Sequence, residues 1–134
     1  MICVMKRWLL RLVWMLSLLP AIHAADVHLT ELDAGRKRLS LKIGDTLRVT
    51  LPSNPSTGYT WEDQWTREGI LKSRSEKHYE PLKSEKLLVG GGGGENFHYL
   101  ATGRGTTTLT FSYLRPWEKS VSPERIVAWD ILVE

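Results

Sequence analysis

Apolar residues recur at every second position along most of the chain, with polar residues between them. This alternation is typical of a β-strand with one buried and one solvent-facing side, whereas a helix repeats about every 3.6 residues. The apolar positions of the successive runs are Leu39, Leu41 and Ile43; Leu47, Val49 and Leu51; Tyr59, Trp61 and Trp65; Phe97, Tyr99 and Ala101; Leu109, Phe111 and Tyr113; and Val127, Trp129, Ile131 and Val133. The pattern predicts an all-β domain with no convincing helical segment.

Turn signals separate these runs, among them Gly44-Asp45 and the glycine-containing residues 103–105. The segment 70–79 is more polar and is typical of an edge strand. About seven to eight short strands with this spacing predict an immunoglobulin-like β-sandwich, in which two sheets pack face to face. Trp61 and Trp129 alternate with polar neighbours, so we expect both in the core.

The first 24 residues follow a different pattern. A basic segment ends at Arg11, an apolar run covers residues 12–19, and Ala24 is the small residue that a signal peptidase requires. The apolar run is too short to span a membrane, which takes about 20 residues, and a structural helix is the alternative interpretation. The sequence therefore predicts that residues 1–24 are a signal peptide, cleaved after Ala24 or one residue later. Residues 25–134 would then be an exported domain, periplasmic or secreted.

Removal of this segment changes the charge of the protein. The chain has 18 Lys and Arg residues and 15 Asp and Glu residues, and three of the basic residues but none of the acidic ones lie in residues 1–24. The mature domain is formally neutral, so its charge gives no reason to expect binding to nucleic acid. Cys3 is the single cysteine and leaves with the segment. The domain must therefore be stabilised by its core without disulfides, for which about 110 residues suffice.

Three loops carry features that a simple sandwich does not need, and the first is Asn54–Tyr59. Pro55 fixes its own φ, and Gly58 allows a φ that other residues resist. Two hydroxyl residues, Ser56 and Thr57, lie between them. A turn between neighbouring strands is the simpler interpretation of this loop, and a rigid binding loop is the alternative.

The second loop is a run of five consecutive glycines. They are Gly90, Gly91, Gly92, Gly93 and Gly94. A flexible connector is one interpretation, and a bare backbone surface that another protein can approach closely is the other. A phosphate-binding loop is excluded, because no Lys-Ser or Lys-Thr follows and no helix is expected there.

The third loop contains Arg115, Pro116 and Trp117, directly after a predicted strand. The alternation stops here, so Trp117 is the tryptophan that we expect in a loop. A stray surface aromatic is possible, but Trp and Arg are the residues that most often carry binding energy at protein interfaces. A neighbouring proline lowers the cost of ordering such a loop.

The sequence gives little support to catalysis. His28, His78 and His98 have neither metal-ligand spacing nor a nearby cysteine, and no Gly-x-Ser-x-Gly motif is present. We therefore predict no catalytic residue, no metal and no cofactor.

The three loops together resemble the signature loops of the chagasin family, which are protein inhibitors of papain-like cysteine peptidases. The order and approximate spacing agree, and the resemblance extends over most of residues 25–134, including Tyr59-x-Trp61. Two departures occur: Ser56 stands where the family usually has threonine, and the glycine run is longer than the usual Gly-x-Gly-Gly.

This resemblance implies a sandwich with the three loops at one end. The first loop would enter the peptidase cleft, with the glycine run and Trp117 flanking it and Arg115 assisting or bracing the loop. It implies a reversible and competitive inhibitor whose partner is a papain-like cysteine peptidase, with an interface of about 1,600 Å². The neutral surface and the closed fold, rather than the resemblance, make a monomer the default expectation. An adhesion or assembly module of the cell envelope that uses the same end is the alternative, and a hydrolase is a weaker third.

Overall fold

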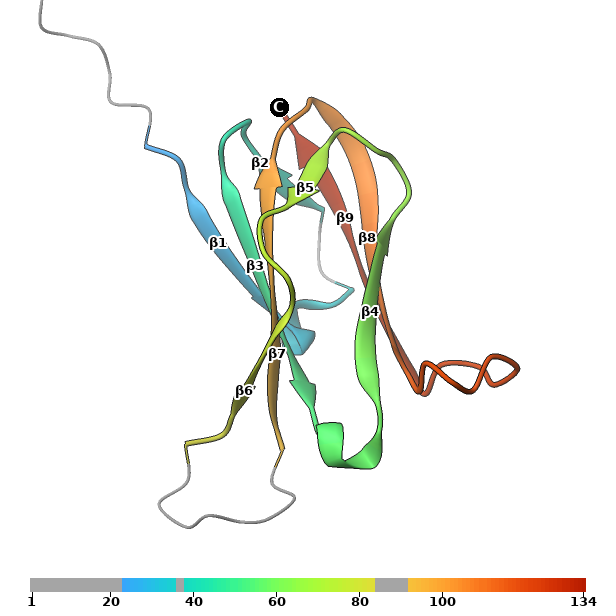
Figure 1. Ribbon diagram of the computed structural model, residues 1–134. Helices are drawn as coiled ribbons and strands as arrows, with labels where there is room; N and C mark the ends of the chain where they lie inside the picture. The colour runs from blue at the N-terminus through green and yellow to red at the C-terminus, as the bar shows by residue number, and fades with distance from the viewer. Residues whose placement is uncertain (1–22, 36–37, 84–91) are drawn as a thin grey trace, which may run out of the picture.

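The computed structural model describes residues 23–35, 38–83 and 92–134, and over these residues the chain forms nine strands and two short 3-10 helices (Figure 1). The strands are β1 (Asp26–Thr30), β2 (Leu39–Leu41), β3 (Thr46–Ser53), β4 (Thr60–Trp65), β5 (Leu71–Ser73), β6 (His78–Pro81), β7 (Gly93–Ala101), β8 (Gly105–Leu114) and β9 (Arg125–Val133). The 3-10 helices are η1 (Glu31–Asp33) and η2 (Pro55–Thr57). The prediction of an all-β domain is confirmed.

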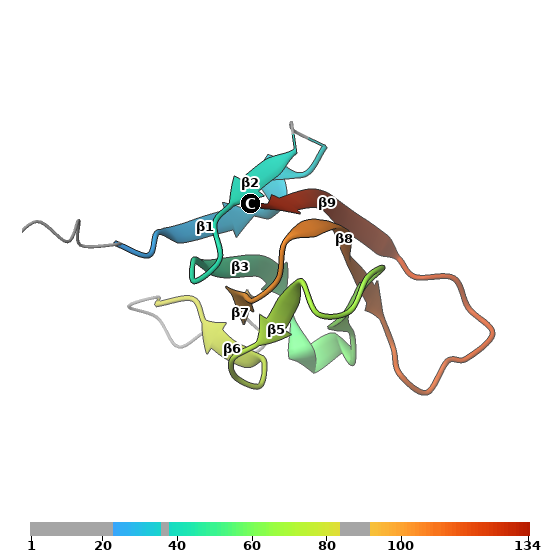
Figure 2. The ribbon, with the colours of Figure 1, turned by 90° about the horizontal axis from the view of Figure 1, so that it is seen from above.

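The strands form two sheets packed face to face, as the alternation predicted (Figures 1 and 2). One sheet has the order β1-β3-β7-β5, with β6 also paired to β7, and the other has the order β2-β9-β8-β4. The pairs β1–β3 and β2–β9 are parallel, and the other pairs are antiparallel. The strand number exceeds the expected seven to eight for two reasons. Residues 26–30 add β1, and the polar segment 70–79 contains β5 and the start of β6, which pair with opposite ends of β7.

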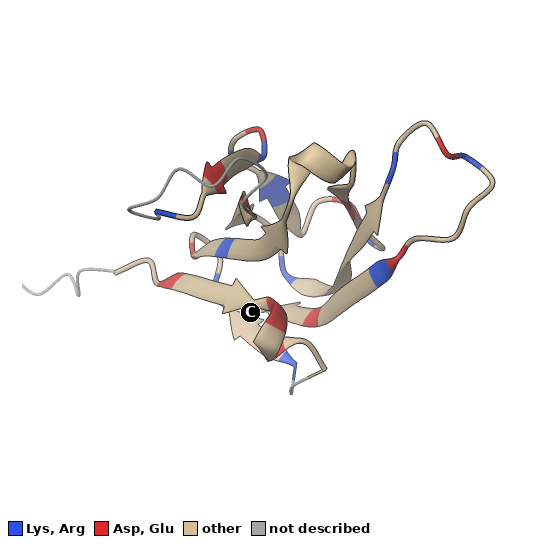
Figure 3. Cartoon of the chain, turned by 90° about the horizontal axis from the view of Figure 1, so that it is seen from below, with Lys and Arg blue, Asp and Glu red and all other residues tan. Residues whose placement is uncertain are grey.

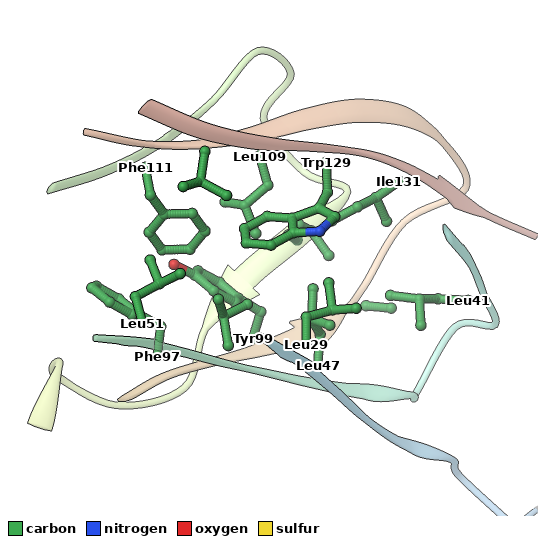
Figure 4. Close-up of a cluster of buried hydrophobic side chains, with 14 of the residues drawn as sticks. Leu29, Leu41, Leu47, Leu51, Phe97, Tyr99, Leu109, Phe111, Trp129 and Ile131 are labelled. Atoms are coloured by element: carbon green, nitrogen blue, oxygen red, sulfur yellow. The ribbon is translucent and has the colours of Figure 1, made fainter. Parts of the chain in front are cut away.

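The core consists of the inward side chains of both sheets, which point toward one another (Figure 4). Phe111 is central: its ring centroid lies 4.8 Å from that of Phe97 and 5.8 Å from that of Trp129. Trp61 and Trp129 are both buried, so the prediction that they belong to the core is confirmed. Aromatic contacts of this kind combine large apolar burial with a preferred edge-to-face geometry, and they stabilise a domain that lacks disulfides.

Ile43 differs from its prediction. Strand β2 ends at Leu41, and Ile43 is 48% exposed rather than buried with Leu39 and Leu41. The cause is the turn that follows, in which the Asp45 carboxylate accepts a hydrogen bond from the Lys42 N–H. At this turn the chain crosses from one sheet to the other, because β2 pairs with β9 whereas β3 pairs with β1 and β7.

The two ends of the sandwich carry different connections. At one end, the lower one in Figure 1, β3 and β8 end while β4, β7 and β9 begin. The three loops singled out above connect to strands at this end, which we call the loop end. The opposite end carries the short turns around Asp45 and Gly103, which are joined by two hydrogen bonds: the Ala101 N–H donates to the Asp45 carbonyl oxygen, and the Gly44 N–H donates to the Ala101 carbonyl oxygen. No helix among the described residues is long and apolar enough to cross a membrane.

Candidate binding edge

Loop 1, residues 54–59, is a single 3-10 turn with a defined start and stop. Asn54 is extended (φ −135°, ψ 92°), Pro55 opens η2, and Gly58 ends it with φ 81°. The Gly58 N–H donates to the Pro55 carbonyl oxygen at 3.0 Å. A side chain disfavours such a positive φ, and a proline is well suited to the first position of a helix. The shape-setting roles predicted for Pro55 and Gly58 are therefore confirmed.

The two hydroxyl groups of loop 1 donate their hydrogen bonds within the loop. Ser56 Oγ donates to Asn54 Oδ1 at 2.6 Å, and Thr57 Oγ1 donates to the Asn54 carbonyl oxygen at 2.6 Å. Both residues are exposed. Because a hydroxyl oxygen keeps its lone pairs after donating, the two side chains offer acceptors to a partner rather than donors.

An aromatic stack supports loop 1 from the core side. The Tyr59 and Tyr113 ring centroids are 5.1 Å apart and stacked, and the Trp61 and Tyr113 centroids are 4.8 Å apart. The Asn54 N–H donates to Tyr113 Oη at 3.2 Å, and Trp61 Nε1 donates to the Pro52 carbonyl oxygen at 2.9 Å. The loop is thus anchored to the core through rigid side chains on both of its flanks.

Arg115, the first residue of the β8–β9 connection, contacts loop 1 directly. Its Nε donates to the Thr57 carbonyl oxygen at 3.1 Å, and its guanidinium carbon lies 4.5 Å from the centroid of the Tyr59 ring. Its Nη1 forms an ion pair with Glu118 at 3.2 Å. Arg115 therefore joins this connection, which we call loop 3 (residues 115–124), to loop 1.

Trp117 lies in loop 3 and is 66% exposed, as its sequence context predicted. Its ring packs so closely on Gly58 that a Cβ at position 58 would overlap the indole. The glycine is thus required twice, for its positive φ and for this contact. Pro116, between Arg115 and Trp117, is exposed.

Tyr59 also contacts the far end of loop 3. A hydrogen bond to the Glu124 carboxylate raises the pKa of Tyr59 above its usual value. The same loop closes at its root through the Glu124 N–H, which donates to the Tyr113 carbonyl oxygen at 2.9 Å.

The glycine run is placed differently from the loop that we expected. Gly90 and Gly91 lie outside the described residues, and Gly92 directly precedes β7. Gly93 and Gly94 belong to β7, where they pair with β3 on one side and with β6 on the other. A Cβ on Gly93 would overlap the Glu80 carbonyl oxygen and the Tyr79 ring, so the glycine permits a close approach within a sheet.

Glu95 is a residue of this end that the sequence reasoning missed. It is 4% exposed, and its Oε1 accepts a hydrogen bond from Ser53 Oγ at 2.6 Å. Its Oε2 accepts from Thr60 Oγ1 at 3.1 Å and from the Trp61 N–H at 3.2 Å, and lies 3.7 Å from Lys77 Nζ. A signal was present, since Glu95 has the same alternation parity as the buried Phe97 and Tyr99. A carboxylate at a core position requires such partners.

Viewed from below, loop 1 lies between the start of β7 and loop 3 (Figure 3). Loop 1 carries no charged residue, and the charges of the edge belong mainly to loop 3. Among the described residues no group of three or more His, Cys, Asp or Glu side chains could hold a metal ion. The arrangement is a mostly uncharged edge made of a rigid turn, the glycines at the start of β7 and an exposed tryptophan.

Comparison with known proteins identifies the family to which the chain belongs. The sequence model of the chagasin family peptidase inhibitors I42 matches residues 40–131. The chain therefore belongs to the chagasin family of cysteine peptidase inhibitors, which are not enzymes, and the resemblance drawn from the three loops is confirmed.

Two curated relatives and one solved structure illustrate the similarity. The chain is 32% identical over 80 residues to Chagasin of Trypanosoma cruzi, which covers 59% of this chain and 73% of the relative. It is 29% identical over 109 residues to Amoebiasin-2 of Entamoeba histolytica, covering 81% of this chain and 87% of the relative. The crystal structure of the cysteine protease inhibitor EhICP2 from Entamoeba histolytica superposes with a TM-score of 0.75 at 26% identity, covering 84% of this chain and 98% of the other.

Proposed function

We propose that the domain inhibits papain-like cysteine peptidases reversibly and competitively, by filling the active-site cleft with the loop end. Membership in the chagasin family supports an inhibitor of cysteine peptidases. The observation that carries the cleft-filling role is the projection of loop 1 between two flanking elements at a single end of the sandwich (Figure 3).

Loop 1 acts as the wedge. Its exposed Ser56 and Thr57 face outward from a 3-10 turn, so the loop excludes substrate and water from the catalytic cysteine. Attack by a cysteine nucleophile requires a carbonyl aligned with the nucleophile, and peptidases hold substrates in extended form to achieve this. Residues Pro55–Thr57 form a 3-10 turn, and Gly58 turns the chain away with a φ of 81°, so the loop is not extended. The bound loop therefore remains uncleaved.

The flanking elements supply the rest of the contact. Trp117 presents an exposed indole that can stack on an aromatic wall of the cleft. Tryptophan is among the residues that most often form interface hot spots. On the other flank, Gly92 directly precedes β7 and has no side chain that would keep a partner away, whereas Gly93 and Gly94 are paired with β3 and β6. An interface of about 1,600 Å² in total is typical of peptidase–inhibitor complexes.

We further propose that the protein is exported and acts as a monomer. Residues 1–24 have the order of basic, apolar and small residues that signal peptides show, and export would place the inhibitor in the periplasm or outside the cell. The mature domain would then be residues 25–134.

An inhibition profile tests this function. Residues 25–134 are titrated against papain and cathepsins, with serine and metallo-peptidases as controls. We expect inhibition of at least one papain-like enzyme at or below micromolar concentration and none of the controls. The absence of inhibition across the papain-like enzymes at micromolar concentrations would contradict the proposal, and a stable partner of another class would favour an assembly module.

A further inference from the structure

Glu95 connects the two strands that loop 1 joins. Ser53 is the last residue of β3 in one sheet, and Thr60 is the first residue of β4 in the other. The Glu95 carboxylate accepts hydrogen bonds from both of them and from the Trp61 N–H. It therefore spans the gap between the sheets directly beneath loop 1.

We propose that Glu95 is the positioning residue of the binding edge, whose carboxylate fixes the separation of the two ends of loop 1 and so sets the shape presented to a peptidase. The inference rests on the proposed function for its inhibitory consequence. The hydrogen bonds inside loop 1 define a turn, but none of them fixes how far apart Ser53 and Thr60 lie. A loop that must be ordered on binding loses affinity. The hydrogen bonds that Glu95 accepts from both ends of loop 1, which we call the Glu95 clamp, hold the loop in its binding shape beforehand.

The donors around Glu95 require a carboxylate rather than an amide. The Trp61 backbone N–H and the Lys77 ammonium group can only donate, whereas the hydroxyls of Ser53 and Thr60 can rotate. A glutamine removes the negative charge that Lys77 pairs with, and its NH2 group would replace either Oε2, which faces both fixed donors, or Oε1, which accepts from Ser53 Oγ at 2.6 Å and from the Trp61 N–H at 3.4 Å. Lys77 also donates to Thr60 Oγ1 at 2.6 Å and to the Trp61 carbonyl oxygen at 2.9 Å, so the charge of Glu95 is compensated within the same cluster.

The test compares Glu95→Gln with a matched substitution of another buried carboxylate, Asp45→Asn. Asp45 is 7% exposed and lies at the opposite end of β3. We expect Glu95→Gln to raise the inhibition constant about tenfold or more under conditions where the variant is fully folded. Asp45→Asn should lower the thermal midpoint and leave the inhibition constant unchanged. Equal inhibition constants for the wild type and a folded Glu95→Gln would overturn the proposal.

Amide hydrogen exchange separates this proposal from the proposed function. In Glu95→Gln, the amide hydrogens of Asn54 and of residues 56–60 should exchange faster, while those at the Asp45 turn should not change. This measurement needs no peptidase, so it tests the clamp even if the wild type inhibits no papain-like enzyme. Unchanged exchange in loop 1 would contradict the clamp.

If Glu95→Gln fails to fold, Lys77→Met provides the second variant. The Lys77 side chain is 43% exposed, so its loss is tolerated more easily than a change at Glu95. It should give a smaller increase in both loop exchange and inhibition constant, and no change in either would overturn the proposal.

Asp45 carries a second, independent inference. Its carboxylate accepts from the Ala25 backbone N at 2.9 Å, and the Ala25 carbonyl oxygen accepts from the Thr46 N–H at 2.9 Å. Ala25 thus directly precedes the β1–β3 pairing, whose first pair is Asp26 opposite Thr46. The hydrogen bonds from the Lys42 and Ala25 backbone N–H groups hold the pKa of Asp45 below its usual value.

We infer that Asp45 is the receptor for the α-ammonium group that cleavage after Ala24 would create. The inference rests on the proposed export. Hydrolysis of the Ala24–Ala25 peptide bond consumes one water, leaves a carboxylate on Ala24, and leaves an amino group on Ala25 that is protonated at neutral pH. The neutral N–H donor to Asp45 then becomes a charged one, and charge-assisted hydrogen bonds are the stronger kind.

The test uses purified chains that begin at Ala25, with either a free or an acetylated amino group. We expect the free form to have an unfolding equilibrium constant several-fold smaller, and Asp45→Asn should remove the difference. Equal stability of the two forms, or a difference that survives in Asp45→Asn, would overturn the inference. Mass spectrometry of the exported product should show Ala25 as its first residue, and another first residue would also overturn it.

Discussion

Loop 1 and loop 3 share one binding edge but are held in opposite ways. Loop 1 spans six residues, and both the backbone of its 3-10 turn and its two hydroxyl groups are hydrogen-bonded within the loop. Loop 3 is longer and has few hydrogen bonds for its length: the Glu118 N–H donates to Arg115, the Val121 N–H to Glu118 and the Glu124 N–H to Tyr113, and Arg115 forms an ion pair with Glu118. Its exposed apolar residues, Trp117 and Val121, lie between Arg115 and Glu124.

This difference shows how a small sandwich can present a rigid loop and an adjustable loop to the same partner. A fully bonded turn enters a cleft at little entropic cost, whereas a longer loop with few hydrogen bonds can adjust to its partner beyond the turn that holds Trp117. The two loops still form one unit, because Arg115 bonds to Thr57 and Trp117 packs on Gly58. Substitutions at these contacts should reveal how far the two loops act together.

The largest effect is expected for Gly58→Ala, which strains a positive φ and pushes a Cβ into Trp117. We expect inhibition to weaken about 100-fold, or about 2.7 kcal/mol, with the free energy of unfolding lowered by about 1 kcal/mol or more. Gly69→Ala is the matched control, since Gly69 has the same φ of 81° and nothing within 4 Å of an added Cβ. Gly69→Ala should lower the free energy of unfolding without changing the inhibition constant. An equal loss of inhibition in the two variants would show that the contact between Gly58 and Trp117 does not matter for inhibition.

Trp117→Ala should have the next largest effect on inhibition. Loss of an exposed hot-spot indole weakens binding by about 1–3 kcal/mol, measured from inhibition constants. Chemical denaturation should show an unchanged free energy of unfolding, because the side chain is 66% exposed. Ile43→Ala, an exposed apolar residue of the opposite end, serves as control and should change neither quantity. Comparable losses of stability and inhibition in Trp117→Ala would assign Trp117 to the core instead.

Arg115→Ala should weaken inhibition by about 1 kcal/mol, because the bond to the Thr57 carbonyl oxygen and the contact with the Tyr59 ring are both lost. Arg115→Lys keeps the charge but not the planar group, so it should behave nearly as the alanine variant does. Full inhibition by Arg115→Lys would mean that the charge alone matters. Inhibition constants for the three proteins decide between these outcomes.

The smallest effect is expected for Ser56→Ala. It removes one hydrogen bond to Asn54, while the Ser56 N–H still donates to the same oxygen at 3.3 Å. The binding free energy calculated from the inhibition constant should weaken by about 0.5 to 1 kcal/mol. A loss as large as that of Trp117→Ala would show that the Ser56 hydroxyl itself contacts the peptidase.

Much of this edge could be predicted from the sequence because its features are local. Proline and glycine restrict or extend backbone angles wherever they stand, so Pro55 and Gly58 identified the turn without any tertiary information. The break in alternation after Leu114 likewise placed Trp117 in a loop. Period-two alternation then identified the buried faces of the longer strands.

The remaining features depend on contacts between distant residues. Gly93 and Gly94 lie within a strand because β3 and β6 flank them on both sides, and a glycine run carries no alternation to indicate this. Ile43 follows the alternation but stands in a turn that Asp45 closes. The alternation places Glu95 on the buried face of β7, but the donors from three other segments that make a buried carboxylate tolerable there cannot be predicted from a local pattern.

The most direct test of the cleft-filling account is the affinity of residues 25–134 for papain whose cleft is already occupied. A covalently attached peptidyl inhibitor that covers both sides of the catalytic cysteine would block the cleft, and calorimetry would compare binding to the blocked and the free enzyme. The account predicts that binding to the blocked enzyme is abolished. Equal affinity for the two forms would place the contact elsewhere on the peptidase and contradict it.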